Sequence, residues 1–485
     1  MALALLIING LALTFILIYS FVQLDLVALY CRWIKRKAVP SGSSQPYPFV
    51  TVQLPIFNEY YVAERLIDAV MAIRYPEDRF QVQVLDDSND ETVDLIAEKV
   101  SEWQEKGGRI EHVRRSNRTG FKAGALAYGL QSAQGTLIAV FDADFLPAPD
   151  FLERTVPVFQ NEEVGLVQTK WEHINEDHSM LTRLQAFGLD AHFSVEQGGR
   201  NQGGHFINFN GTAGVWRRTC IEDAGGWQSD TLTEDLDLSY RAQIRGWTFR
   251  FLEDVGSPAE LPAAMTALKT QQYRWNKGAA ECTRKNLPKV LKDRKVPLNT
   301  KIHAVFHLMN SSIFVCVLLA ALLSIPALFI KHYRPEYGIA FKIGSVYVLA
   351  LLFLILFYWT SFSRTMKGMK GFLLFLIRFP MFLAVSMGMS LHNGIAVLEG
   401  YSGVKSRFLR TPKFNIKGKA DDWKGKRYMV GRVSPLTFLE GFLAVYFAWG
   451  IYLAYYFGDA GLLPFHLLLT IGFGFVTYYS VRHAE

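Results

Sequence analysis

Thr136-Leu-Ile-Ala-Val-Phe-Asp-Ala-Asp144 is the stretch of sequence that decides the fold. Its first six residues are uncharged and mostly aliphatic or aromatic, which predicts a buried strand. Asp142 and Asp144 follow at the carboxyl end of this strand. Carboxylates with this spacing place two hard oxygen ligands on one side of a loop, where they can share Mg²⁺ or Mn²⁺ with a diphosphate. The stretch therefore predicts a strand end that holds a divalent cation and a phosphorylated ligand.

Two earlier strands are predicted, and each of them ends in acidic residues. Residues 49–54 form an apolar strand that leads to Glu59, and residues 81–85 form a second one that leads to Asp86 and Asp87. Helical periodicity follows each strand, and this alternation predicts a mainly parallel sheet with ligands bound beyond the carboxyl ends of its strands. Paired acids at such an end suit a ribose hydroxyl or a base edge. The alternative is that they only cap the next helix.

A glycine-containing loop at residues 117–126 opens another predicted helix and carries Lys122. Backbone amides at a helix start, together with a lysine, suit a phosphate group, although a Gly-Lys helix start is common by itself. Asp142 follows Lys122 by twenty residues within the same α/β pattern. This order favours a diphosphate site built from the loop and the Asp-x-Asp segment together.

Polar and aromatic motifs continue downstream at residues 209–216, 232–237 and 271–275. Transfer of a sugar to a hydroxyl group needs a base on the acceptor side, while a metal neutralises the leaving diphosphate on the other side. Asp235 is the candidate base and Glu234 its orienting partner. The alternative is that this acidic pair only opens a helix with favourable dipole charges. Arg274 is a candidate phosphate ligand, and Trp275 offers an apolar platform to a sugar ring.

The composition indicates that part of the chain lies in lipid. Of its 485 residues, 50% are hydrophobic and only 20% are charged, which excludes a disordered or fibrous chain. Residues 2–30 are almost uncharged and precede a basic run, the reverse of the order in a signal peptide, so we expect a transmembrane helix with a cytoplasmic basic end. The four cysteines lie far apart, so neither a disulfide framework nor a cysteine zinc site is indicated.

Hydrophobic stretches of about the length that spans a bilayer return after residue 300. They cover residues 303–330, 342–361, 372–393, 436–457 and 462–481. Residues 395–435 carry ten Lys or Arg against three acidic residues, which predicts a cytoplasmic loop. Because the insert at 36–300 is expected on the same side, we expect 372–393 to lie in the interface or to re-enter. This leaves five spans, and six complete spans are the alternative.

The predicted fold is an α/β domain inserted after the first helix of an α-helical membrane region. The basic segment 281–301 is expected at the membrane interface, with a solvated linker as the alternative. The expected divisions are a transmembrane helix at 1–31, a cytosolic catalytic domain at 36–280, the basic segment at 281–301, two transmembrane helices plus an interfacial or re-entrant helix at 302–393, a basic cytosolic loop at 394–435, and two transmembrane helices at 436–485.

Taken in order, the motifs resemble the membrane-integrated family 2 glycosyltransferases, which include cellulose, chitin and hyaluronan synthases. The ordered set is Asp86-Asp87, Asp142-Ala-Asp144, Thr233-Glu-Asp235 and Gln271-x-x-Arg274-Trp275. Within this group, the sequence is similar to the cellulose synthase-like A mannan and glucomannan synthases at residues 84–88, 120–126, 141–145, 210–214 and 222–227. The resemblance covers about residues 45–290 and implies a GT-A catalytic domain.

The resemblance also implies a role for each motif. Asp235, with Glu234, would be catalytic in an inverting transfer, and Asp142 and Asp144 would bind the metal. The implied donor-binding residues are Glu59, Asp86, Asp87, Lys122, Asp142 and Arg274, and the implied acceptor-binding residues are Gln271, Trp275, Gly211, Thr212 and Trp216. A gating loop covers the nucleotide in cellulose synthase, and a similar motif here contains Phe408, Arg410, Thr411 and Lys413. The alternative for this loop is binding to anionic lipid.

The expected function is the inverting, metal-dependent transfer of a sugar from UDP-glucose or GDP-mannose to a growing β-glycan, coupled to membrane translocation. The alternative is transfer of a single sugar to a membrane lipid such as ceramide. A non-catalytic scaffold or transporter is disfavoured because Asp142, Asp144 and Asp235 are all present. Expected partners are the donor, a glycan or lipid acceptor and membrane lipids, with no nucleic acid. The catalytic domain is expected to be cytosolic, at a bacterial inner membrane or the Golgi.

Overall fold

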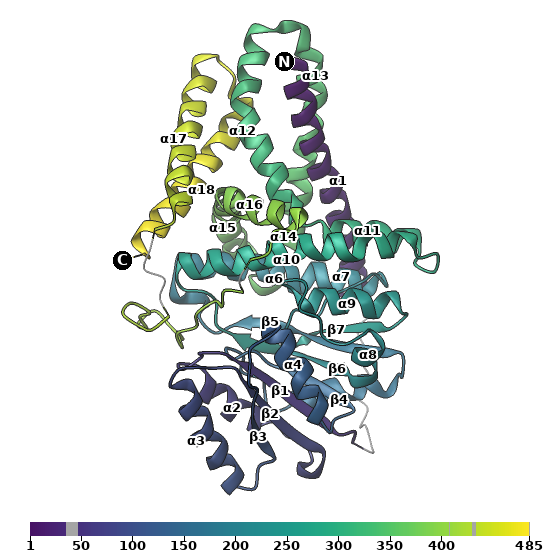
Figure 1. Cartoon of the computed structure of the whole chain (residues 1–485). Helices are drawn as coiled ribbons and strands as arrows, with labels where there is room; N and C mark the ends of the chain where they lie inside the picture. Colours follow the sequence, from purple (N-terminus) through teal and green to yellow (C-terminus); the bar gives the residue numbers. More distant parts are fainter. Residues whose placement is uncertain (35–46, 407, 429–432, 485) are drawn as a thin grey trace.

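The computed structural model describes residues 1–34, 47–406, 408–428 and 433–484. An α/β domain lies beneath a bundle of long helices, and α1 (Ala2–Ile34) runs from the far end of the bundle toward the domain (Figure 1). Some basic residues used in the topology argument lie outside the described residues, namely Lys35, Arg36, Lys37, Arg407 and Arg432.

One mixed sheet forms the centre of the α/β domain. In the described part of the chain it has seven strands in the order β3-β2-β1-β4-β6-β5-β7. The strands are β1 (Val50–Ile56), β2 (Phe80–Asp86), β3 (Ile110–Arg114), β4 (Leu137–Val140), β5 (Val164–His173), β6 (Gly214–Arg217) and β7 (Thr248–Ala259). Neighbouring strands are parallel except around β6, which is antiparallel to both β4 and β5.

Helices cover both faces of this sheet, and the chain passes from them into the bundle through one long helix. They are α2 (Ala63–Met71), α3 (Thr92–Glu105), α4 (Phe121–Ser132), α5 (Phe151–Thr155), α6 (Met180–Ala191), α7 (Gln197–Gln202), α8 (Arg218–Asp223), α9 (Glu234–Ile244) and α10 (Met265–Lys292). A π-helical turn, His192–Glu196, joins α6 to α7. Because α10 is continuous, the expected boundary at 280/281 falls inside a helix.

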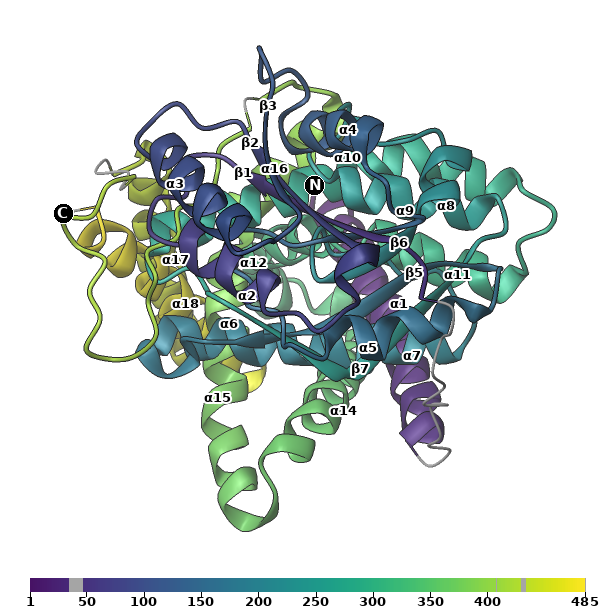
Figure 2. The same cartoon turned by 90° about the horizontal axis from the view of Figure 1, so that it is seen from below.

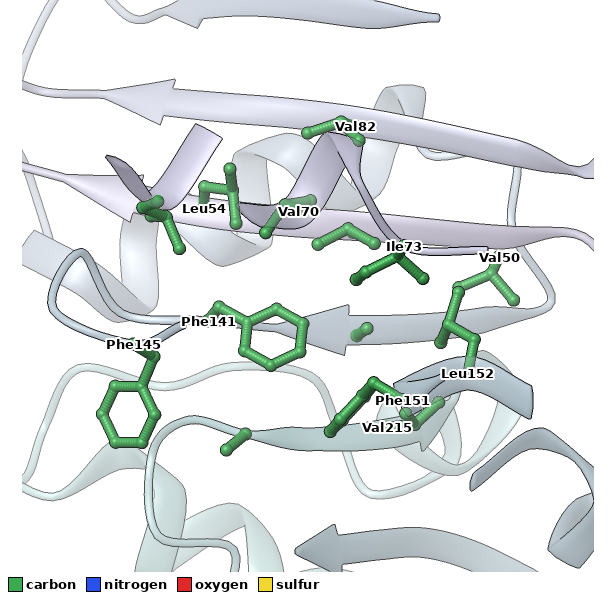
Figure 3. Packing of buried hydrophobic residues seen from close by; sticks show 14 of the residues in the cluster. Val50, Leu54, Val70, Ile73, Val82, Phe141, Phe145, Phe151, Leu152 and Val215 are labelled. Carbon is green, nitrogen blue, oxygen red and sulfur yellow. The ribbon is translucent and has the colours of Figure 1, made fainter. Parts of the chain in front are cut away.

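Apolar side chains from successive strands pack against these helices. On one face, Val50 and Leu54 of β1 meet Val70 of α2 and Phe151 of α5, while Phe141 extends the cluster beyond β4 (Figure 3). A second cluster, which includes Leu126 of α4, covers the other face. Central strands with both faces covered bury nearly every residue, as in other α/β sheets. The strand ends that carry the polar motifs are therefore held on a rigid layer.

The bundle is helical where hydropathy predicts it, but the expected stretches 303–330 and 372–393 are each divided between two helices. Its elements after α10 are α11 (Leu298–Leu308), α12 (Ser312–Tyr333), α13 (Gly338–Gly344), α14 (Val348–Thr365), α15 (Gly368–Gly388), α16 (Ser390–Ser402), α17 (Pro435–Tyr456) and α18 (Leu463–Arg482). Among the described residues, six helical segments are long and apolar enough to cross a bilayer, α15 included. The chain is therefore a multi-pass membrane protein.

Helix α15 differs from the other long helices in direction. It is seen nearly end-on in Figure 1 and along its length in Figure 2, so it runs across the bundle rather than along it. One side of α15 exposes a stripe of apolar side chains that includes Met369, Leu373 and Ile377. A helix that lies across the bundle with such a stripe suits the membrane interface better than a full crossing. Five complete spans stay our prediction.

Candidate active site

A polar pocket lies beyond the carboxyl ends of β1, β2 and β4, the edge where an α/β sheet is expected to bind its ligand. Its walls come from the α/β domain, from α10 and from the loop that follows α16. The predicted residues that line it are Glu59, Asp87, Lys122, Asp142, Asp144, Gly211, Glu234, Asp235, Gln271, Arg274, Trp275, Phe408, Arg410, Thr411 and Lys413. Segments more than 300 residues apart in the sequence thus meet at one site.

Glu59 stands at the turn after β1. Asn58 before it has a left-handed φ of 53°, and its backbone N–H donates to Ser88 Oγ at 2.8 Å, which ties this turn to the end of β2. Arg410 Nη2 donates to Glu59 Oε2 at 2.6 Å. Burial raises the pKa of Glu59 to about 7, although the Arg410 guanidinium opposes the shift. The turn therefore joins the sheet to the loop after α16.

The two acids at the end of β2 have different surroundings, because successive strand residues point to opposite sides. Asp86 is buried and accepts hydrogen bonds from the Ser88 N–H at 2.8 Å and from His112 Nε2 at 2.9 Å. Asp87 lines the pocket and accepts two hydrogen bonds from Arg115, at 2.7 and 2.6 Å. Of the two, only Asp87 therefore faces the pocket, and Asp86 supports the turn.

Lys122 occupies the middle of the pocket. Its Nζ donates to Asp142 Oδ1 at 2.5 Å and to the Gly211 carbonyl at 2.8 Å, and it lies 4.0 Å from Glu234 Oε1. Burial lowers the pKa of Lys122, but Asp142 and Glu234 outweigh this and hold it above its ordinary value. The buried hydroxyl of Thr212 accepts the Asp142 N–H at 2.8 Å and fixes the start of the Asp-x-Asp segment. Lys122 is therefore a permanent positive charge beside the acidic motif.

The acidic segment has the donor chemistry of a divalent cation site. Asp142 and Asp144 both line the pocket, and each carboxylate is paired with an ammonium group, Lys122 in one case and Lys413 at 2.6 Å in the other. Their oxygens are the hard ligands that Mg²⁺ or Mn²⁺ prefers, and such an ion would share or replace the ammonium contacts and complete its shell with phosphate oxygens and water. The residues present therefore fit the predicted metal.

Glu234 and Asp235 open helix α9 (Glu234–Ile244) and line the same pocket as Lys122. Asp235 Oδ1 accepts the Leu236 N–H at 2.8 Å. Gly211 has a φ of 83°, and a Cβ there would lie 3.0 Å from Asp235 Oδ2, so a glycine is required next to this carboxylate. Burial raises the pKa of Asp235 to about 7, and repulsion from Glu234 adds to the shift. A carboxyl group with a pKa near neutrality suits a general base.

Helix α10 forms the wall between the pocket and the membrane helices. Gln271, Arg274 and Trp275 line the pocket from this helix. Arg274 Nη2 donates to Thr411 Oγ1 at 3.2 Å, and the Arg274 guanidinium lies 4.7 Å from the centre of the Phe408 ring. The predicted phosphate ligand thus contacts the loop that carries Arg410 and Lys413.

Some predicted residues lie outside the pocket lining, and some lining residues were missed. Asp86 is turned away, Thr212 is buried behind Asp142, and Trp216 is fully buried in the core against Phe209, so none of the three side chains reaches the pocket. The sequence reasoning missed the lining residues Phe57, Arg118, Trp171 and His173. Trp171 and His173 end strand β5, and their place at a strand end was the available signal.

The sequence comparisons point to one family. Residues 46–278 match the family described as "Glycosyltransferase like family 2". The chain is 38% identical over 348 residues to glucomannan 4-beta-mannosyltransferase 1 of Oryza sativa subsp. japonica, which covers 68% of this chain and 66% of the relative. It is 35% identical over 380 residues to glucomannan 4-beta-mannosyltransferase 7 of Arabidopsis thaliana, covering 72% of this chain and 67% of the relative. The matches span from about half to two thirds of the length of such plant relatives.

A solved structure is similar in fold. It is a mannosyltransferase from Pyrobaculum calidifontis in complex with GDP-Man and Mn²⁺, with a TM-score of 0.57 and 20% sequence identity. The similarity covers 82% of this chain and 100% of that one. It confirms the predicted GT-A type of α/β fold.

Proposed function

The chain belongs to family 2 of the glycosyltransferases, and we propose that it transfers a mannosyl group from GDP-mannose to a growing β-glycan with inversion at the anomeric carbon. The observation that carries this proposal is that one pocket holds the Asp-x-Asp carboxylates, Lys122 paired with Asp142, and a buried carboxyl group, Asp235, whose pKa is raised. A leaving diphosphate needs the cation and the lysine, and an acceptor hydroxyl needs a base. The plant relatives named for β-mannosyl transfer and the GDP-Man held by the Pyrobaculum enzyme support the choice of sugar and donor.

The order of residues along the sheet edge fits an extended nucleotide-sugar. Asp87 follows β2, Glu59 follows β1, and Asp142 follows β4, and these three strands are adjacent. The nucleoside would lie near Asp87, and its diphosphate would lie near Lys122 and Asp142. Mg²⁺ or Mn²⁺, held by Asp142 and Asp144, would neutralise the charge that develops on the leaving diphosphate.

Asp235 would act as the general base. Its carboxylate would take the proton of the acceptor hydroxyl while that oxygen bonds to the anomeric carbon and the bond to the diphosphate breaks. A single displacement of this kind inverts the configuration. Lys122 and Glu234 set the charge around Asp235, so that it keeps a raised pKa yet loses its proton near neutral pH. Trp275 and Trp171, whose ring centres are 6.4 Å apart, would form an apolar surface for the acceptor sugar.

The loop after α16 would close the pocket over the donor. Phe408 stacks on Phe121 with ring centres 5.4 Å apart, Arg410 binds Glu59, and Lys413 binds Asp144. These contacts hold the loop across the nucleotide end of the pocket. When the donor is bound, Arg410 and Lys413 would turn to its phosphates, and closure would exclude water from the reaction.

The acceptor side of the pocket adjoins the membrane helices directly. Helix α10, which carries Trp275, forms an ion pair with α16 through Lys277 and the half-buried Glu399 at 3.0 Å, and a buried ion pair with α17 through Lys269 and Glu440 at 2.6 Å. A glycan that leaves the pocket past α10 would meet the bundle next to it. We accordingly place the catalytic domain in the cytosol and couple synthesis to translocation through the bundle.

The test is incorporation of labelled sugar by the purified protein in detergent with Mn²⁺, using GDP-mannose and UDP-glucose in separate reactions. The proposal predicts a β-mannan product from GDP-mannose that β-mannanase degrades, and no product with Asp235→Asn. Label found only in the lipid fraction would replace the polymer acceptor with a lipid. Incorporation from UDP-glucose alone would overturn the proposed donor.

A further inference from the structure

Arg118 lies at the nucleoside end of the pocket and has no assigned role. It belongs to the loop between β3 and α4, and its guanidinium carbon is 3.3 Å from the centre of the Phe57 ring. This contact with the ring face holds the planar group in one orientation. Within the described residues, Nε of Arg118 is buried and has no hydrogen-bond partner. Arg118 also lines the pocket, and no hydrogen bond from its guanidinium to another described residue is present, so its terminal nitrogens are available to a ligand there.

The neighbouring Asp87 is not equally free to read a base. Nε and Nη2 of Arg115 bind its two carboxylate oxygens, and Nη2 also donates to the Phe121 carbonyl at 2.7 Å. A carboxylate held by a fork of two donors keeps one acceptor site on each oxygen, so it can still accept hydrogen bonds but cannot donate any. The closest approach of Arg118 Nε to Asp87 is 3.9 Å, longer than a hydrogen bond. Asp87 can thus contact only donor groups of a nucleoside, and Arg118 is the neighbouring group that can contact acceptors.

Arginine is a donor-only group, so it selects a base edge that carries acceptors. Guanine offers two adjacent acceptors, O6 and N7, which match the arginine fork. Adenine replaces O6 with an amino donor, and uracil places its N3–H donor beside O4, so neither gives the fork two acceptors. We propose that Arg118, oriented by Phe57, reads the O6 and N7 atoms of the nucleobase and makes the site selective for a guanine nucleotide. This inference rests on the proposed function, because it concerns the donor of that reaction.

The proposal is tested by the equilibrium binding of free nucleotides to the purified full-length protein with Mn²⁺, measured by calorimetry. GDP and IDP share O6 and N7, whereas 7-deaza-GDP lacks N7, and UDP and ADP lack the pair. Wild-type protein is expected to bind GDP and IDP about tenfold to hundredfold more tightly than UDP, ADP and 7-deaza-GDP. In Arg118→Lys, which keeps the charge but not the fork, these ratios should fall to about one.

A matched control is Arg109→Ala. Arg109 also lies over a phenylalanine ring, 5.3 Å from the centre of Phe49, but it is outside the pocket lining. This variant should keep the wild-type ratios. If Arg118→Lys or Arg118→Ala weakens GDP and UDP equally, Arg118 binds phosphate and the inference is wrong. Unchanged ratios in both Arg118 variants would overturn it as well.

The role of Arg118 and the proposed mannosyl transfer can fail independently of each other in these experiments. Selective GDP binding that depends on Arg118, without mannosyl transfer, would refute the transfer and leave the inference standing. Mannosyl transfer with unchanged base selectivity in the Arg118 variants would refute the role of Arg118 and leave the proposed transfer standing.

Discussion

The pH dependence of transfer is set by the raised pKa of Asp235. A general base must be deprotonated, so activity should fall as pH drops through its pKa. With a pKa of about 7, the deprotonated fraction of Asp235 falls about tenfold between about pH 8 and pH 6. An aspartate with an ordinary pKa would show almost no change over this range. The fall in activity on the acidic side of the pH profile is called the acidic limb. Because the Glu234 carboxylate raises the pKa of Asp235, Glu234→Gln should move this limb to lower pH.

The assay is kcat/KM for GDP-mannose across this pH range, since this parameter reports the free enzyme. Glu59 is the control, because its pKa is also raised to about 7 but it contacts Arg410 rather than the acceptor side. Glu59→Gln should keep the acidic limb. A flat profile in the wild-type protein, or a limb that survives unchanged in Glu234→Gln but disappears in Glu59→Gln, would refute the assignment of Asp235 as the base.

Other substitutions test the rest of the site. Asp144→Asn removes a carboxylate from the proposed cation site and should weaken Mn²⁺ activation about tenfold to hundredfold, seen as a shift in the Mn²⁺ concentration that gives half-maximal rate. Phe408→Ala removes a ring pair worth about 0.5–1.5 kcal/mol and should raise the donor KM by up to about tenfold; an unchanged KM would contradict closure by this loop. Glu440→Ala leaves the buried Lys269 without a partner and should destabilise the protein by about 3–5 kcal/mol, measured as a lower midpoint of thermal unfolding, whereas Glu336→Ala on the exposed surface should not.

The catalytic fold follows from local patterns that the sequence displays. Strand β4 and its Asp-x-Asp end are specified by neighbouring residues, because an apolar run and the acids after it are adjacent in the chain. The antiparallel strand β6 was not predicted, since its place between β4 and β5 is fixed by pairing between segments that lie far apart. For the same reason Trp216 was assigned to the acceptor site, although its position in β6 turns it into the core.

Single residues within a motif were harder to assign than the motif itself. The pair Asp86-Asp87 was expected to act on the nucleoside, yet alternation at a strand end allows only one of two neighbours to face the pocket. The contact between Lys413 and Asp144 joins residues 269 positions apart and was not predicted; the resemblance to a gating loop indicated only that Lys413 serves the same site. Arg118 lay inside a quoted loop, but its availability depends on Arg115 occupying Asp87, which no sequence pattern displays.

The central claim is a single displacement with Asp235 as the base, and the configuration of the new linkage tests it most directly. GDP-mannose carries its sugar in the α configuration, so proton NMR of the first product formed by the purified protein should show a β-mannosyl linkage that is absent with Asp235→Asn. An α-mannosyl linkage, or a β-linked product formed equally well by the variant, would contradict the account.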